Sequence, residues 1–159
     1  YLQENNLTNL GELEKTCDAA SQKFNDFGNQ IKAAEQRMKD ISELQRHIGT
    51  YSKTREVYVQ YRKLTGRKKE KFYEQHSSEI TACQAAKQYF NSLGLKKLPS
   101  MQSLKQEYAV LQAEKKKRYP EYRQAKEKMI ELLTAKNNVE RILGATEKEK
   151  NRDRQQGSR

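Results

Sequence analysis

The residues that most often carry catalysis or bind metals are few and scattered in this chain. His47 and His76 are the only histidines, and they lie 29 positions apart, so we expect no metal site at either. There is no glycine-rich phosphate loop and no serine–histidine–aspartate set, and the carboxylates stand beside Lys or Arg at positions that a helix would expose. We therefore expect no active site, no cofactor and no metal, so the chain itself is not expected to be an enzyme.

Phosphate binding is the chemistry that the sequence does favour. The 159 residues include 32 Lys or Arg and 21 Asp or Glu, for a net charge of +11. Residues 51–118 carry sixteen basic and six acidic residues, against six and eight in residues 1–50 and ten and seven in residues 119–159. Because a concentrated positive field favours phosphate-bearing partners, we expect a nucleic acid as a partner.

The candidate nucleic-acid-binding residues lie in this basic middle segment. They are Lys53, Arg55, Arg62, Lys63, Arg67, Lys68, Lys69, Lys71, Lys96, Lys97, Lys115, Lys116, Lys117 and Arg118. Tyr58 and Tyr61 are the candidates for stacking on unpaired bases. Tyrosines at helical spacing are more often packing residues, and a lysine run is commonly a solvated face, so both alternatives stay open.

The elements expected to position these residues are long helices. Good helix formers dominate, only two Pro and seven Gly occur, and 34% apolar content is too little for a thick globular core. Apolar spacings of three and four alternate along two stripes, which is typical of a coiled-coil seam. The first stripe is Leu10, Leu13, Cys17, Ala20, Phe24, Phe27, Ile31, Ala34, Met38 and Ile41. The second is Leu104, Tyr108, Leu111, Lys115, Arg118, Tyr122, Ala125, Met129, Leu132, Lys136, Val139 and Leu143.

We expect the two stripes to pack against each other. The predicted fold is all-α: a long antiparallel helical hairpin, with a coiled-coil-like stalk and two shorter helices forming a basic head. A single elongated domain spans residues 1–144, with the stalk at 8–48 and 119–143 and the head at 49–118, and residues 145–159 form a disordered charged tail. Charged seam positions disfavour one long parallel dimer, so a monomer is expected, with a coiled-coil dimer as the alternative.

Local signals predict where the helices bend and end. Gly49 is expected to bend or break the first helix, and Gly66 to terminate it. Gly94 is expected to end the second of the two middle helices. Ser100 is the expected N-cap of the last long helix, which Pro120 is expected to kink without breaking.

The two middle helices are expected to meet at a serine. The first contains Phe72 and Tyr73, and Ser77 or Ser78 is expected to cap the second.

Six segments, which together span most of residues 1–143, carry a family resemblance. They are YLQEN at 1–5, IKAAE at 31–35, VY at 57–58 with YR at 61–62, LGLKKLP at 93–99, KKK at 115–117 with YPEYR at 119–123, and LLTAK at 132–136 with RIL at 141–143. Through these segments the chain resembles the C-terminal region of relaxases, the mobilization proteins of bacterial conjugative elements.

The resemblance implies a helical accessory region that follows a DNA-nicking nuclease domain. Its implied work is to bind DNA near the transfer origin, or to dock the relaxase on transfer-machinery proteins, during plasmid or transposon mobilization. In that family the nuclease domain uses a catalytic tyrosine and a histidine cluster that holds a metal. Two histidines 29 positions apart cannot form such a cluster, and Tyr1 is not in a comparable setting, so no catalytic residue carries over.

The remaining signals concern the compartment and two further functions. Cys17 and Cys83 are expected to be reduced thiols of a cytoplasmic protein. No run approaches the roughly 18 apolar residues of a membrane span and no signal peptide opens the chain, so no membrane association is expected. The chain begins with Tyr rather than Met, which suggests a fragment of a longer protein. A coiled-coil adaptor that binds protein and no nucleic acid is the alternative function; a basic surface on an acidic membrane is a weaker third.

Overall fold

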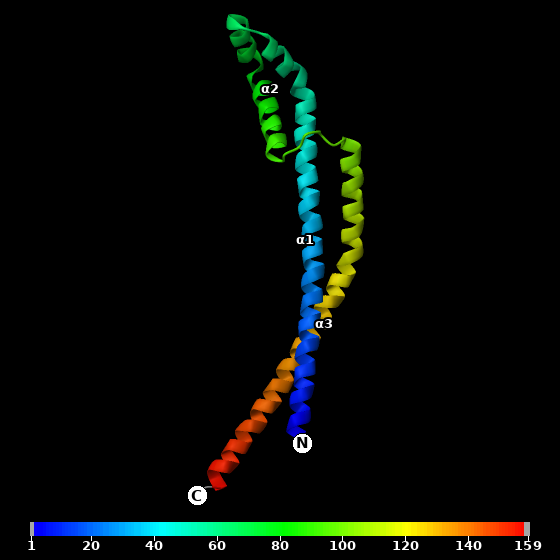
Figure 1. The fold of residues 1–159 in the computed structure, drawn as a ribbon, viewed down its shortest axis with the longest axis vertical. Helices are drawn as coiled ribbons and strands as arrows, with labels where there is room; N and C mark the ends of the chain where they lie inside the picture. The colour runs from blue at the N-terminus through cyan, green and yellow to red at the C-terminus, as the bar shows by residue number, and fades with distance from the viewer. Residues whose placement is uncertain (1, 158–159) are drawn as a thin grey trace. The chain divides into compact units, whose positions relative to one another are not determined.

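Three α-helices make up the part of the chain that the computed structural model describes, residues 2–157 (Figure 1). They are α1 (Leu2–Lys63), α2 (Gly66–Ser92) and α3 (Met101–Gly157). No strand occurs among these residues, which confirms the all-α class. Their contacts divide the chain into unit 1 (Tyr1–Ala33 with Glu114–Arg159) and unit 2 (Ala34–Ala113), so α1 and α3 each contribute a segment to both units.

The first helix is continuous for 62 residues, so of the bend or break expected at Gly49 the break does not occur. Glycine inside a helix costs about 1 kcal/mol relative to alanine. Two neighbouring side chains, Ile48 and Tyr51, pack against the core of unit 2 on the same stretch of α1. This packing outweighs the local preference of one glycine.

Gly66 begins the second helix instead of terminating the first. α1 ends at Lys63, and Thr65 is the extended residue that precedes α2, with φ −138° and ψ 155°. Gly66 has a φ of +65°, a left-handed conformation that residues with a side chain rarely adopt. The glycine was correctly identified as a turn residue, but it belongs to the entry of α2.

The two expected middle helices are both contained in α2, where they meet at a kink. His76 has φ −126° and ψ 25°, outside the helical region, while helical hydrogen bonding continues on both sides of it. The kink lies one residue before Ser77 and two before Ser78, the two predicted caps. Neither Pro nor Gly occurs between Gly66 and Ser92, so nothing in the sequence forces a full stop.

The end of α2 and the start of α3 follow the predicted caps. Gly94 has φ +68° and donates its N–H to the carbonyl oxygen of Asn91 at 3.0 Å, while Leu95 donates to that of Phe90 at 3.3 Å. These two bonds form a Schellman motif. At the other side of the connector, the Ser100 hydroxyl oxygen accepts the backbone N–H of Ser103 at 3.1 Å, which confirms the predicted N-cap.

The last helix passes through Pro120 without interruption, as predicted. It also continues beyond Gly144, where we expected a disordered tail. Residues 145–157 are helical and every side chain there is exposed, and residues 158–159 lie outside the described part. The segment is rich in Glu, Lys, Arg and Gln, which favour helix formation without any packing.

Burial confirms both predicted stripes. All ten positions of the first stripe and all twelve of the second are buried or half-buried. Cys17 and Cys83 are both buried and both free.

Unit 2 contains the larger core, where parts of all three helices meet. Its buried members are Ile41, Leu44, Ala86, Phe90 and Leu104.

In unit 1 the stripes of α1 and α3 pack directly on each other. The Phe24 and Tyr122 rings stack with centroids 4.9 Å apart, and Arg118 donates a hydrogen bond to Gln30 Oε1. A Cβ added at Gly28 would lie 3.3 Å from the Tyr122 ring, so the helices approach closely there. From Phe24 to Gln30 along α1, the contacted residue of α3 changes from Tyr122 back to Arg118.

Candidate nucleic-acid interface

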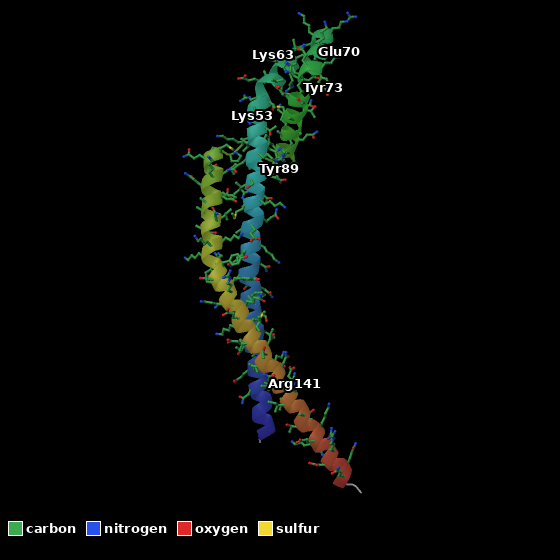
Figure 2. All side chains as sticks on the ribbon, turned by 180° about the vertical axis from the view of Figure 1, so that it is seen from behind. Lys53, Lys63, Glu70, Tyr73, Tyr89 and Arg141 are labelled. Atoms are coloured by element: carbon green, nitrogen blue, oxygen red, sulfur yellow. The ribbon has the colours of Figure 1, made fainter. Side chains whose placement is uncertain are left out.

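The turn between α1 and α2 gathers the densest group of cations in unit 2. Six of the ten residues from 62 to 71 are Lys or Arg, and only one is acidic. We call this group the turn cluster: Arg62, Lys63, Arg67, Lys68, Lys69 and Lys71. The first two lie in the last turn of α1 and the other four in the first six residues of α2. Figure 2 shows Lys63 on one side of this turn and Glu70 and Tyr73 on the other.

The charges of the turn cluster are uncompensated. Five of its side chains are exposed, and Lys69 is half-buried. Within residues 2–157, no member forms an ion pair. The first turn of α2 contains no acidic residue, and the positive end of the α2 dipole adds to the same field.

The two tyrosines predicted to stack on bases are half-buried and covered in part by lysines. The Lys69 ammonium lies 4.9 Å from the centroid of the Tyr61 ring, and that of Lys87 lies 4.5 Å from the Tyr58 ring. The two tyrosine centroids are 6.4 Å apart. Both rings therefore have cation–π and aromatic partners inside the protein.

A third tyrosine, which sequence reasoning missed, is better placed. Tyr73 is 43% exposed, and its ring lies 5.9 Å from that of Tyr61 at an angle of 44°. No lysine or arginine covers its ring in the described part of the chain. The available signal was the position of Tyr73 two residues after Lys71, at the edge of the basic stretch.

A shallow hollow of about 530 Å³ lies next to the turn cluster. It is lined by Tyr61, Gly66, Lys69, Glu70, Tyr73 and Glu74. The hollow thus combines two aromatic rings, one cation and two carboxylates, all from the end of α1 and the start of α2.

The other predicted basic residues of unit 2 lie away from the turn. Lys53 and Arg55 are exposed on α1, about two turns or more before the end of that helix. Lys96 and Lys97 are exposed in the connector after α2, a helix of 27 residues and therefore about 40 Å long. The turn cluster does not include them.

The run from Lys115 to Arg118 belongs to unit 1 and not to the unit that contains the turn cluster. Lys116 and Lys117 are exposed, whereas Lys115 and Arg118 are half-buried on the α3 stripe. Arg118 is engaged with Gln30, as described above. The predicted site residues therefore fall into a turn cluster in unit 2 and a separate run in unit 1.

The histidines are packing residues in this structure. His47 stacks on Tyr89 with centroids 3.9 Å apart, and burial and the neighbouring Arg46 lower the pKa of His47. His76 packs against Phe72, 4.4 Å away. Over residues 2–157, no three His, Cys, Asp or Glu side chains are grouped so as to hold a metal ion.

In the described chain, none of the three helices has an apolar stretch long enough to cross a membrane. No protein-family model, curated protein or solved structure matches the chain.

Proposed function

We propose that this chain is a non-catalytic helical region that binds nucleic acid through the turn cluster. The observation that carries the proposal is the concentration of six cations in ten residues, on both sides of one turn and without ion pairs in the described chain. Such cations neutralise phosphates and release condensed counterions, which makes binding favourable and steeply dependent on salt.

The position of these cations on α2 supports a role outside folding. Arg67, Lys68 and Lys69 occupy the positive end of the helix dipole, where a cation is unfavourable by about 0.3–1 kcal/mol at low ionic strength. A helix start that served stability alone would favour Asp or Glu. The basic residues are therefore better explained by an external anionic partner.

The finer architecture is also a proposal. We propose that the segments of unit 1 form a coiled-coil-like antiparallel stalk and that the turn cluster is the basic head of unit 2. The stacked Phe24 and Tyr122 rings, and the hydrogen bond between Gln30 and Arg118, support the antiparallel order. An apolar hollow lined in part by Leu10 and Val139 extends the same order toward the start of α1.

DNA is the proposed partner, and conjugative transfer in the cytoplasm is the proposed setting. Both rest on the resemblance to the C-terminal region of relaxases together with the turn cluster. The setting is tested by the gene sequence that precedes the codon of Tyr1. A DNA-nicking nuclease domain in the same reading frame is expected, and a different upstream domain would contradict the relaxase assignment.

The binding proposal is tested by fluorescence anisotropy with labelled single- and double-stranded oligonucleotides. The test variant is Arg67→Glu with Lys68→Glu, and the charge-matched control is Lys148→Glu with Lys150→Glu in the exposed end of α3. Each lost phosphate contact is expected to reduce the slope of log K against log salt by about 0.7 for single strands and about 0.9 for duplex. For the double variant, the slope of log K against log salt should therefore be reduced by about twice these amounts.

Three results would contradict binding through the turn cluster. Wild-type protein that shows no salt-dependent binding would refute the proposal. Equal slopes and affinities for the wild type and the turn variant, or an equal loss in both variants, would show that the turn cluster is not the contact surface. Lys116→Glu with Lys117→Glu measures the contribution of the second basic run.

A protein-binding adaptor is the second candidate function, and one observation favours it. Ile130 and Leu133 are 50% and 37% exposed, one helical turn apart on α3. Capture of a partner from nuclease-treated host lysate, lost on Ile130→Ser with Leu133→Ser, would support this function. Capture that is unaffected by the double variant would count against this surface.

A further inference from the structure

We infer that the hollow beside the turn cluster binds one unpaired nucleobase, stacked on Tyr73, of a strand whose phosphates contact the turn cluster. The inference rests on the proposed function and specifies its ligand: single-stranded nucleic acid, or an unpaired end or bulge. DNA and RNA share the required chemistry, and the experiment below measures the binding of both.

The geometry of the two tyrosines leaves an aromatic face available. The Tyr61 and Tyr73 rings are tilted by 44° with centroids 5.9 Å apart, so they do not cover each other face to face. Lys69 covers one face of Tyr61, whereas Tyr73 is 43% exposed. Aromatic residues that bind single strands present such a face, because every base can stack on it.

The size of the hollow suits a ligand as small as a base. Its volume of about 530 Å³ falls within the range of about 300–1,000 Å³ that is typical of small-ligand sites. Gly66 forms part of the wall, and a Cβ built there would meet no atom within 4 Å. The absence of a side chain at this position keeps that wall open.

The charges that line the hollow favour a neutral base inside it over a phosphate. Glu70 and Glu74 line it together with Lys69, so a phosphate inside would face two carboxylates and one ammonium. A base is neutral, and the exocyclic amino group of cytosine or adenine donates hydrogen bonds that a carboxylate accepts. The base therefore belongs inside the hollow, and its phosphates belong outside it, on Arg67 and Lys68.

The absence of tryptophan from the sequence permits a direct optical test. Tyr73→Trp introduces a single indole at the proposed stacking face, and Ile142→Trp is the control, because Ile142 is 65% exposed and lies in unit 1, far along α3 from the second basic run. The ligands are short oligodeoxycytidine, oligothymidine and oligocytidine RNA, with heparin as a polyanion without bases. Stacking should quench the indole of the Tyr73→Trp protein with oligonucleotides and not with heparin, and should leave the control unchanged.

Affinity provides the second readout. Loss of one base–aromatic stack corresponds to a roughly 5- to 150-fold weaker Kd for Tyr73→Ala, while Tyr73→Phe should bind like the wild type. Because Tyr73 is 43% exposed and lies outside the buried core, both variants should keep the wild-type circular dichroism spectrum. Oligodeoxycytidine should bind more tightly than oligothymidine, and Glu70→Gln with Glu74→Gln should reduce that difference.

The outcomes separate this inference from the proposal on which it rests. Binding that Arg67→Glu with Lys68→Glu weakens, but with no quenching at position 73 and an unchanged Kd for Tyr73→Ala, would overturn the base site and leave the phosphate contact standing. Quenching by heparin as strong as that by the oligonucleotides would overturn the base site in the same way. If no oligonucleotide binds the wild type, both the proposed function and this inference are wrong.

Discussion

Replacement of Leu104 by alanine should destabilise unit 2 strongly, because this side chain joins α3 to the other two helices. Leu104 is 2% exposed and belongs to the buried cluster with Ile41, Leu44, Ala86 and Phe90. A buried leucine replaced by alanine costs about 2–5 kcal/mol, through lost burial and the cavity left behind. The free energy of unfolding of a domain is only about 5–15 kcal/mol, so the loss is a large part of the total.

Urea unfolding followed by far-ultraviolet circular dichroism measures this loss. With an m-value of about 1–3 kcal/mol per molar urea, the midpoint should fall by at least about 0.7 M. Val110→Ala is the control on the same helix, since Val110 is 57% exposed and should change stability by less than about 0.5 kcal/mol. Equal midpoints for the two variants would refute the packing of α3 on the core of unit 2.

Three further predictions concern a glycine, an ion pair and a histidine. Gly49→Ala should stabilise the protein by about 0.5–1 kcal/mol in urea unfolding, because the position is helical and a Cβ there meets no atom within 4 Å. Gly28→Ala should stabilise it less, because a Cβ at that position would lie 3.3 Å from a tyrosine ring. An equal gain in stability for the two variants would contradict the close approach of the helices at Gly28. Arg37 donates to Glu107 at 2.7 and 3.1 Å, and this hydrogen bond lowers the pKa of Glu107. A carboxylate with a depressed folded-state pKa stabilises the protein above its unfolded value of about 4.3 and loses that contribution as pH falls. Because the side chains of Arg37 and Glu107 are 47% and 41% exposed, Glu107→Gln should cost no more than about 1 kcal/mol of stability at pH 7 and almost nothing at pH 3. The same cost at both pH values would contradict a lowered pKa of Glu107. The lowered pKa of His47 means that this imidazole binds a proton more readily in the unfolded chain, so stability should fall as pH drops below about 6.5. His47→Gln should make the free energy of unfolding less dependent on pH over that range. A pH profile that His47→Gln leaves unaltered would contradict this prediction.

Periodicity and capping chemistry were readable from the sequence because they depend on near neighbours. The two stripes follow from side chains three and four positions apart, and burial confirms all their members. The Schellman motif at Gly94 and the N-cap at Ser100 need only a few adjacent residues. The turn cluster was predicted for the same reason, because its cations lie within ten positions of each other.

Features that depend on contacts between distant segments were not readable. Gly49 remains helical because its neighbours pack in a core that includes α2 and α3, and the sequence of α1 does not contain that information. The position at which α3 passes from one unit to the other, just before Lys115, has no local signal, so the sequence did not indicate that this run belongs to unit 1. Tyr73 was missed because its exposure depends on how α2 folds back beside Tyr61.

Lysine footprinting tests the central claim most directly. The protein is acetylated with and without a single-stranded oligonucleotide, and the protection of each lysine is read by mass spectrometry. Lys63, Lys68 and Lys71, all exposed in the free protein, should be protected by the bound strand, while Lys148 and Lys150 should react as before. Unchanged reactivity at the three turn lysines under saturating oligonucleotide would contradict binding through the turn cluster.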